Sequence, residues 1–231
     1  MPIDSKAETE LLLLVEGVND CHAVFHLITL LRGNEPNFGI HECGGAEGVL
    51  ESLSGRVIAT TPKQKILGVL LDTDVEGLGA DQVVEARRQQ IDSRLGDFYN
   101  VPADFPEDGL IIRPRLERPD RDRLPIVGVW LMPNNRSLGM LEDLLSASLS
   151  SKTRDYTSSI VSKAKEDKIA KFQEIHHSKA VIRTYMAWQD PPDTQFIGIA
   201  IRNHIFTDAE ESCGPFCKWL ENLFGYEDKA G

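Results

Sequence analysis

The sequence predicts an α/β protein in which helices flank a mainly parallel sheet, with a helical extension at the carboxyl end. Apolar runs of strand length occur at residues 10–15, 65–71 and 126–132, and each is closely followed by glycine, aspartate or proline. Longer segments between these runs carry apolar residues at helical spacing. Such alternation is typical of βαβ units, whose right-handed crossovers build parallel sheets.

The first half of the chain contains three expected strands and two expected helices. The run at residues 10–15 is apolar almost throughout, which is typical of a strand buried on both faces. Asn19 or Asp20 can cap the first helix. After a short strand at residues 38–43, Val49 and its apolar neighbours begin the second helix. The second apolar run named above then forms the third strand.

The next part of the chain contains a helix, an irregular excursion and a last long strand. Residues 81–95 form an amphipathic segment, which predicts a helix. Residues 98–123 are rich in Pro, Asp and Arg, which predicts an exposed excursion with one short strand at residues 110–113. The run at residues 126–132 is again strand-like and stops at Pro133. We expect the strands at residues 10–15, 38–43, 65–71 and 126–132, numbered along the chain, in the order 2-1-3-4.

The carboxyl-terminal part of the chain has mainly helical patterns. We therefore expect two units: an α/β domain over residues 8–150 and a helical extension over residues 151–231 that packs on it. The segment 196–201 fits either a helix or a strand. The remaining helices are expected at residues 141–149, 156–175, 179–188 and 216–224.

Composition limits the classes of function. The net charge of −11 argues against broad, non-specific nucleic-acid binding, which needs a basic surface. It does not exclude an enzyme that acts on nucleic acid, because bound cations can neutralise a carboxylate-lined site. The sequence has no long apolar span and no secretion signal, so we expect a soluble, cytoplasmic protein without membrane contact.

Three carboxylates follow two of the expected strands. Glu16 ends the first strand, and Asp72 and Asp74 come directly after the third. Because the carboxyl ends of parallel strands meet at one edge of a sheet, we expect these side chains in one crevice. Three converging carboxylates do not all stay ionised without a cation. Oxygen ligands of this kind suit Mg²⁺ or Mn²⁺.

The segments around these residues resemble the TOPRIM domain. The resemblance covers about residues 10–150 and rests on three motifs: Glu-Gly in LLLLVEGVND, Gly-Gly in HECGGAEGVL and Asp-x-Asp-x-x-Gly in VLLDTDVEG. TOPRIM domains occur in topoisomerases, bacterial primases, small rRNA-maturing ribonucleases and OLD-family nucleases. The resemblance implies a Rossmann-like parallel sheet flanked by helices. Further segments resemble uncharacterised bacterial TOPRIM-related proteins: residues 127–133, 141–145 and 184–189.

The resemblance also implies roles for individual residues. Glu16 matches the general acid/base residue, and Asp72 and Asp74 match the metal ligands. Gly17 and Gly77 match positions where the backbone approaches the site closely.

Three further residues are candidates on weaker grounds. Glu142 lies in a Gly-x-Leu-Glu stretch similar to the one that supplies a second-metal ligand in OLD-type nucleases. Glu76 is a further possible ligand, with a side chain that points to solvent as the alternative. Lys179 resembles the catalytic lysine of these nucleases, and an ordinary surface lysine is the alternative.

Several other features have structural explanations. The arginines between Arg113 and Arg123 are interleaved with acidic residues, so a self-paired loop competes with a phosphate clamp. Trp188 and Trp219 have apolar neighbours and are expected in the core rather than as base-stacking platforms. The adjacent residues His176 and His177 are expected at the surface as two side chains that point apart.

Two functions from different classes remain. The first is a metal-dependent phosphodiesterase acting on DNA or RNA. The second is a non-catalytic or partner-activated module that works with a separate ATPase, since the chain has no Walker-A motif of its own. No tyrosine is placed as a topoisomerase requires, and we expect none of the template-gripping domains of a topoisomerase or a primase, so neither activity is expected.

Overall fold

The computed structural model describes residues 9–59, 63–75, 77–192, 196–206 and 208–225. Its centre is a five-stranded sheet in the order β2-β1-β3-β5-β4, in which only β4 is antiparallel to its neighbour. The expected order is confirmed for the four parallel strands, and β4 adds to the edge of the sheet beside β5. The strands are β1 (Leu11–Val15), β2 (Gly39–Glu42), β3 (Ile66–Leu71), β4 (Leu110–Ile112) and β5 (Ile126–Leu131).

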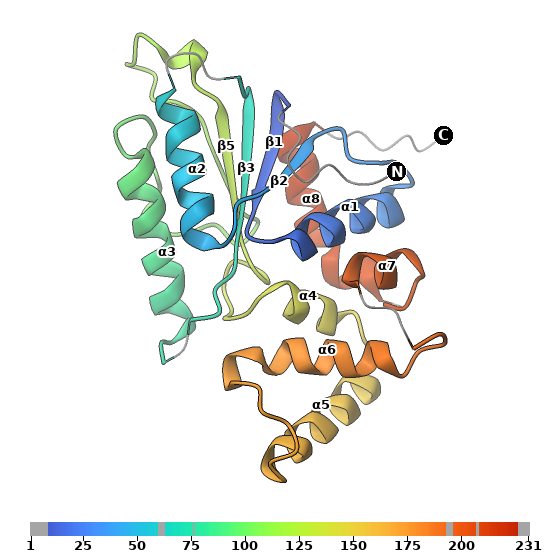
Figure 1. Cartoon of the computed structure of the whole chain (residues 1–231). Helices are drawn as coiled ribbons and strands as arrows, with labels where there is room; N and C mark the ends of the chain where they lie inside the picture. Colours follow the sequence, from blue (N-terminus) through green and yellow to red (C-terminus); the bar gives the residue numbers. More distant parts are fainter. Residues whose placement is uncertain (1–8, 60–62, 76, 193–195, 207, 226–231) are drawn as a thin grey trace.

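Helices cover both faces of this sheet (Figure 1). One face is covered by α2 (Ala46–Ile58) and α3 (Ala80–Leu95), and the other by α1 (Val18–Arg32) and α8 (Ala209–Phe224). The remaining helical segments are α4 (Leu141–Ala147), α5 (Ser151–Glu166), α6 (His177–Ala187), α7 (Ile197–Arg202) and the short 3-10 turns η1 (Arg121–Arg123) and η2 (Glu174–His176). No helix in the described ranges is long and apolar enough to cross a membrane.

The apolar strands alternate their side chains between two cores. Leu12 and Leu14 point to the core under α2 and α3, whereas Leu13 and Val15 point to the core under α1 and α8. All four side chains are fully buried. The absence of polar positions in β1 therefore follows from helices packing on both faces.

Two expectations about the carboxyl-terminal helices need correction, and one open alternative is resolved. The helix expected at residues 156–175 is wrong, because α5 ends at Glu166 and Lys168 takes a left-handed conformation (φ 58°) that stops it. The ambiguous segment 196–201 is helical, as α7. Helix α8 begins at Ala209, so Pro215 lies inside it rather than before it.

Two facing glycines bring α8 close to the sheet. Gly68 of β3 pairs with Gly128 of β5, and a Cβ atom at Gly128 would lie 2.4 Å from the Leu223 side chain of α8. A Cβ at Gly68 would lie 2.9 Å from Phe224. These glycines let α8 form a full layer of the α/β core.

We predict that Gly128→Val destabilises the fold by about 1–3 kcal/mol, because the added methyl groups overpack the β5–α8 contact. Urea denaturation of the purified variant measures this change. The control is Gly55→Ala in α2, where a Cβ meets nothing within 4 Å; it should stabilise by about 0.5–1 kcal/mol. Equal stability of Gly128→Val and the wild type would contradict this packing.

Candidate functional site

A hydrogen bond joins the carboxyl ends of β1 and β3. These strands are parallel neighbours, so Glu16 and Asp72 follow them at the same edge of the sheet. The backbone N–H of Asp72 donates to Oε1 of Glu16 at 2.8 Å. The structure thus brings together two acidic residues that are 56 positions apart.

Asp72 is the most strongly perturbed carboxyl group of the site. Burial raises its pKa to about 9, and nearby carboxylates act in the same direction. These carboxylates belong to Asp20, Glu16, Asp74 and Glu142. The three acidic residues expected from the strand ends therefore lie close enough to interact, and Glu142 joins them.

Asp20 belongs to the same cluster, and the sequence patterns did not single it out. The sequence offers Asn19 or Asp20 as the cap of α1, but Gly17 occupies the N-cap and Asp20 is the third helical residue. Oδ2 of Asp20 accepts a hydrogen bond from the backbone N–H of Gly17 at 2.8 Å. Burial raises its pKa to about 7, and Glu142 and Glu16 reinforce the shift. The spacing Glu-Gly-x-x-Asp could have indicated Asp20, because a helix that starts directly after the strand brings its third residue back to the strand end.

The other carboxyl groups of the site are also desolvated. Glu142 is 4% exposed in the first turn of α4. Burial raises the pKa values of Glu16, Asp74 and Glu142, although neighbouring cations oppose the change. An acidic cluster with this much burial favours either bound protons or a bound cation.

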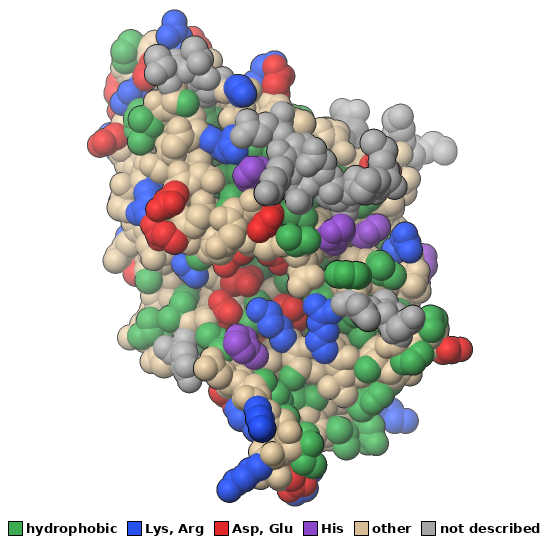
Figure 2. Space-filling view, viewed as in Figure 1, with side chains coloured by type: hydrophobic (Ala, Val, Ile, Leu, Met, Phe, Trp, Pro, Cys, Tyr) green, Lys and Arg blue, Asp and Glu red, His purple; other side chains and the backbone are tan. Residues whose placement is uncertain are grey.

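Two basic side chains face the cluster from different helices. Lys179 of α6 acts to lower the pKa of four carboxyl groups of the cluster, which belong to Glu16, Asp20, Asp74 and Glu142. Arg87 of α3 donates from Nε to the backbone carbonyl oxygen of Asp72 at 3.1 Å. Figure 2 shows acidic side chains near the centre of this face with Lys and Arg side chains directly below them.

Thr73 fixes the backbone between the two aspartates. Its side chain is fully buried, with Oγ1 2.7 Å from the carbonyl oxygen of Met132. The backbone N–H of Gly139 donates to Oγ1 of Thr73, and the Thr73 N–H donates in turn to the Gly139 carbonyl at 2.8 Å. Thr73 thereby ties the segment before α4 to the end of β3 and fixes the backbone from which Asp72 and Asp74 project.

The two glycines of the acidic motifs differ in conformation. Gly77 is left-handed (φ 82°), a conformation that favours glycine. Gly17 is extended (φ −143°), which any residue adopts, and its contribution is the N–H that binds Asp20. Glu76 lies outside the described residues.

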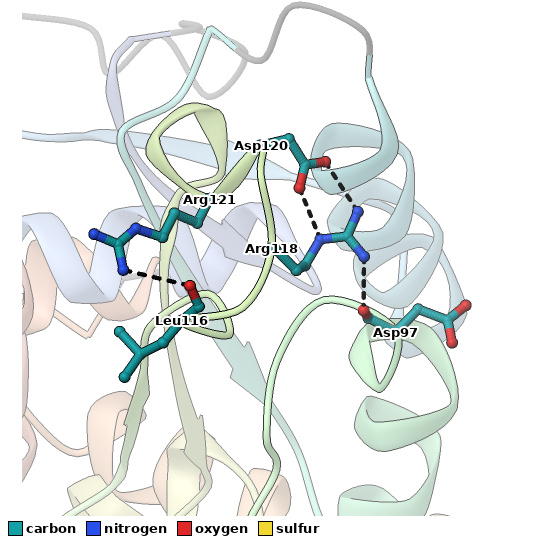
Figure 3. Close-up of polar contacts among 5 residues, drawn as sticks. All are labelled: Asp97, Leu116, Arg118, Asp120 and Arg121. Carbon is teal, nitrogen blue, oxygen red and sulfur yellow. Dashed lines mark hydrogen bonds and ion pairs between the residues drawn. The ribbon is translucent and has the colours of Figure 1, made fainter.

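Other candidates lie apart from the cluster or have structural partners. Figure 3 shows Arg118 paired with Asp120 and donating to the Asp97 carbonyl oxygen, while Arg121 donates to the carbonyl of Leu116. The self-paired loop is therefore confirmed for these arginines.

The expectations for the tryptophans and histidines have mixed outcomes. Trp219 is buried as expected, whereas Trp188 is 49% exposed beside Tyr156, so its assignment to the core is wrong. Trp188 immediately follows α6, a helix that does not pack on the sheet. The two adjacent histidines point apart: His177 lies 3.1 Å from the Ser158 hydroxyl, and His176 is exposed and faces Asp74.

The family of the chain is known from a family model that matches residues 10–225. The chain belongs to DUF3226, a family of proteins of unknown function. No curated protein matches the chain, and no solved structure matches it. The part that matches DUF3226 includes the whole acidic cluster, Lys179 and helix α8, so these features all belong to the family's domain.

The donor set fits a divalent cation in its chemistry. All the acidic groups offer oxygen atoms, which Mg²⁺ and Mn²⁺ prefer. Among the described residues, no three His, Cys, Asp or Glu side chains are grouped so as to hold a metal ion as they stand. Glu16 and Asp20 are turned toward backbone N–H groups. Coordination therefore requires side chains of the cluster to rotate.

Replacing Asp72 by asparagine tests the electrostatics of the cluster. The folded protein holds the Asp72 proton more tightly than the unfolded chain, where aspartic acid titrates near pH 3.9. The proton bound at Asp72 therefore stabilises the folded protein fully below about pH 3.9. This stabilisation is lost as the pH rises toward 9. We predict that Asp72→Asn raises the free energy of unfolding near neutral pH by on the order of 1 kcal/mol or more. Urea denaturation in EDTA measures it.

The control variant is Asp122→Asn, because the Asp122 side chain is 91% exposed. It should leave the free energy of unfolding within about 0.5 kcal/mol of the wild type. The wild-type protein should also lose stability between about pH 5 and pH 8 more steeply than Asp72→Asn. Parallel pH profiles for the wild type and Asp72→Asn would contradict this account.

Proposed function

We propose that the protein is a Mg²⁺- or Mn²⁺-dependent phosphodiesterase that cleaves DNA or RNA at a TOPRIM-like acidic site. The observation that carries this proposal is the hydrogen-bonded pairing of Glu16 and Asp72 at the ends of adjacent parallel strands, with Asp74 beside them. Buried carboxylates with an opposing lysine form a site that suits a cation and a phosphate together.

Each residue has a distinct part in the proposed reaction. Asp72 and Asp74 would hold the cation, with Glu142 as a further ligand. A divalent cation there supplies neutralisation of the phosphate charge and activation of water. Lys179 faces the same carboxylates from α6 and would orient a phosphate oxygen.

Glu16 is suited to proton transfer. Burial raises its pKa above the ordinary value of a glutamate, which is the direction that suits a general acid or base. The Asp72 N–H engages Oε1 and fixes the orientation of the carboxyl group. We assign proton exchange to the other oxygen, Oε2.

The second candidate function is a partner-activated module that works with a separate ATPase. Two observations favour it. The acidic side chains of the described residues are not already grouped around a metal position. In addition, α5, the loop after it and the end of α6 expose apolar side chains on the outer part of the molecule: Tyr156, Ile160, Ile169 and Trp188.

Cleavage assays separate the two functions. The purified protein is incubated with Mn²⁺ and single-stranded, double-stranded or structured nucleic acids. The phosphodiesterase proposal expects metal-dependent cleavage that EDTA abolishes. No cleavage of any substrate by the protein alone, followed by cleavage after addition of a partner ATPase, would favour the second function.

We predict that Glu16→Gln lowers the cleavage rate by roughly 10²–10⁴-fold, the usual contribution of a general acid or base. Substrate affinity should change little, because Asp72 and Asp74 are intact. The matched control is Glu42→Gln, since Glu42 ends the neighbouring strand β2. Recovery of activity at raised Mn²⁺ would instead assign Glu16 to metal coordination, and unchanged activity would exclude it from the site.

A further inference from the structure

A pocket of about 310 Å³ opens beside Asp74. It lies between the segment after β3, the segment before α4, and the region of η2 and α6. Its volume is at the small end of the range of about 300–1,000 Å³ for ligand sites. The roles proposed above use Asp74 at its edge and leave the rest of the pocket unexplained.

The pocket is lined by apolar side chains that the fold leaves exposed. Val75, Leu78 and Leu138 are 36%, 43% and 38% exposed, respectively, and all three line it. Exposed apolar side chains gathered at one concave place are typical of a site that a ligand covers. A flat ligand with apolar faces would remove these side chains from water.

Besides Asp74, two carboxylates line the pocket. Asp143 accepts hydrogen bonds from the Ser178 hydroxyl and from the backbone N–H of Met140, the latter at 2.8 Å. Glu174 is paired with Lys165, which holds the pKa of Glu174 below its ordinary value. Carboxylate oxygens are hydrogen-bond acceptors. A complementary ligand presents N–H donors along one edge.

We propose that this pocket receives one unstacked nucleobase of the substrate and favours bases that carry an exocyclic amino group. The inference rests on the proposed function, because it places the adjoining phosphate at Asp72 and Asp74. A nucleobase has two apolar faces and a polar edge, and the amino groups of adenine, cytosine and guanine are donors. Thymine and uracil lack this group.

The charge of the pocket determines which part of a nucleotide enters it. The Asp143 carboxylate inside the pocket repels phosphate, whereas a cation held at Asp74 attracts it, so the backbone stays at the mouth and the base turns inward. A base within a duplex is stacked and paired, and unstacking it costs a few kcal/mol. The substrate is accordingly single-stranded or locally opened nucleic acid.

A cationic ligand fits the pocket less well. Ser178 and a backbone N–H already satisfy Asp143, and Lys165 already balances the charge of Glu174. The acceptor positions that remain on these two carboxylates suit neutral hydrogen-bond donors of a ligand that lies between the apolar walls. Spermidine provides the contrasting ligand for a binding experiment.

Binding of nucleoside monophosphates in Mg²⁺, measured by saturation-transfer NMR, tests the pocket without relying on cleavage. The wild type should bind dAMP about 3–10-fold more tightly than dTMP, the value of one hydrogen bond. Leu138→Ser should weaken both nucleotides several-fold, and Glu174→Gln should reduce the preference for dAMP. The matched controls are Leu116→Ser and Glu166→Gln, whose side chains are exposed outside the pocket.

The results distinguish failure of the pocket from failure of the enzyme. Equal binding of dAMP and dTMP, or pocket variants that bind like their controls, would overturn the nucleobase assignment even if the protein cleaves nucleic acid. Binding of spermidine without binding of nucleotides would also overturn it. Selective dAMP binding that Leu138→Ser removes, in a protein that cleaves no nucleic acid, would retain the pocket and reject the phosphodiesterase.

Discussion

The parallel pairing of β1 with β3 is the constraint on which the acidic site depends. It puts Glu16 and Asp72 at one edge of the sheet, where the Asp72 N–H binds the Glu16 side chain. Helix α1 then returns Asp20 to the same place, and α4 adds Glu142. The site thus concentrates negative charge in a partly desolvated position, a destabilising arrangement that proteins tolerate where a cation or a proton is needed.

The rest of the fold makes this edge rigid. Thr73 ties the segment before α4 to the end of β3 through buried hydrogen bonds. Behind the sheet, Gly68 and Gly128 allow α8 to lie directly against β3 and β5. The adjoining pocket uses the same loops, so a substrate held there would lie next to Asp74.

Sequence patterns predicted the strands and their order because burial on both faces leaves an unbroken apolar run. They indicated Glu16, Asp72 and Asp74 as site candidates because each follows the end of an apolar run, and such ends are recognisable in the sequence. They did not single out Asp20 for the site, since an aspartate near a helix start has an ordinary explanation as a cap. The end of α5 depends on the left-handed backbone at Lys168, and the exposure of Trp188 depends on the position of α6 away from the sheet. Local spacing encodes neither.

The most direct test is a crystal structure of the protein with Mn²⁺, using the anomalous signal of the ion to find its position. The account predicts a peak between Asp72 and Asp74, with their side chains rotated toward it. No peak at these residues under conditions that saturate surface sites, or a peak only elsewhere on the molecule, would contradict the proposal of a metal-dependent site.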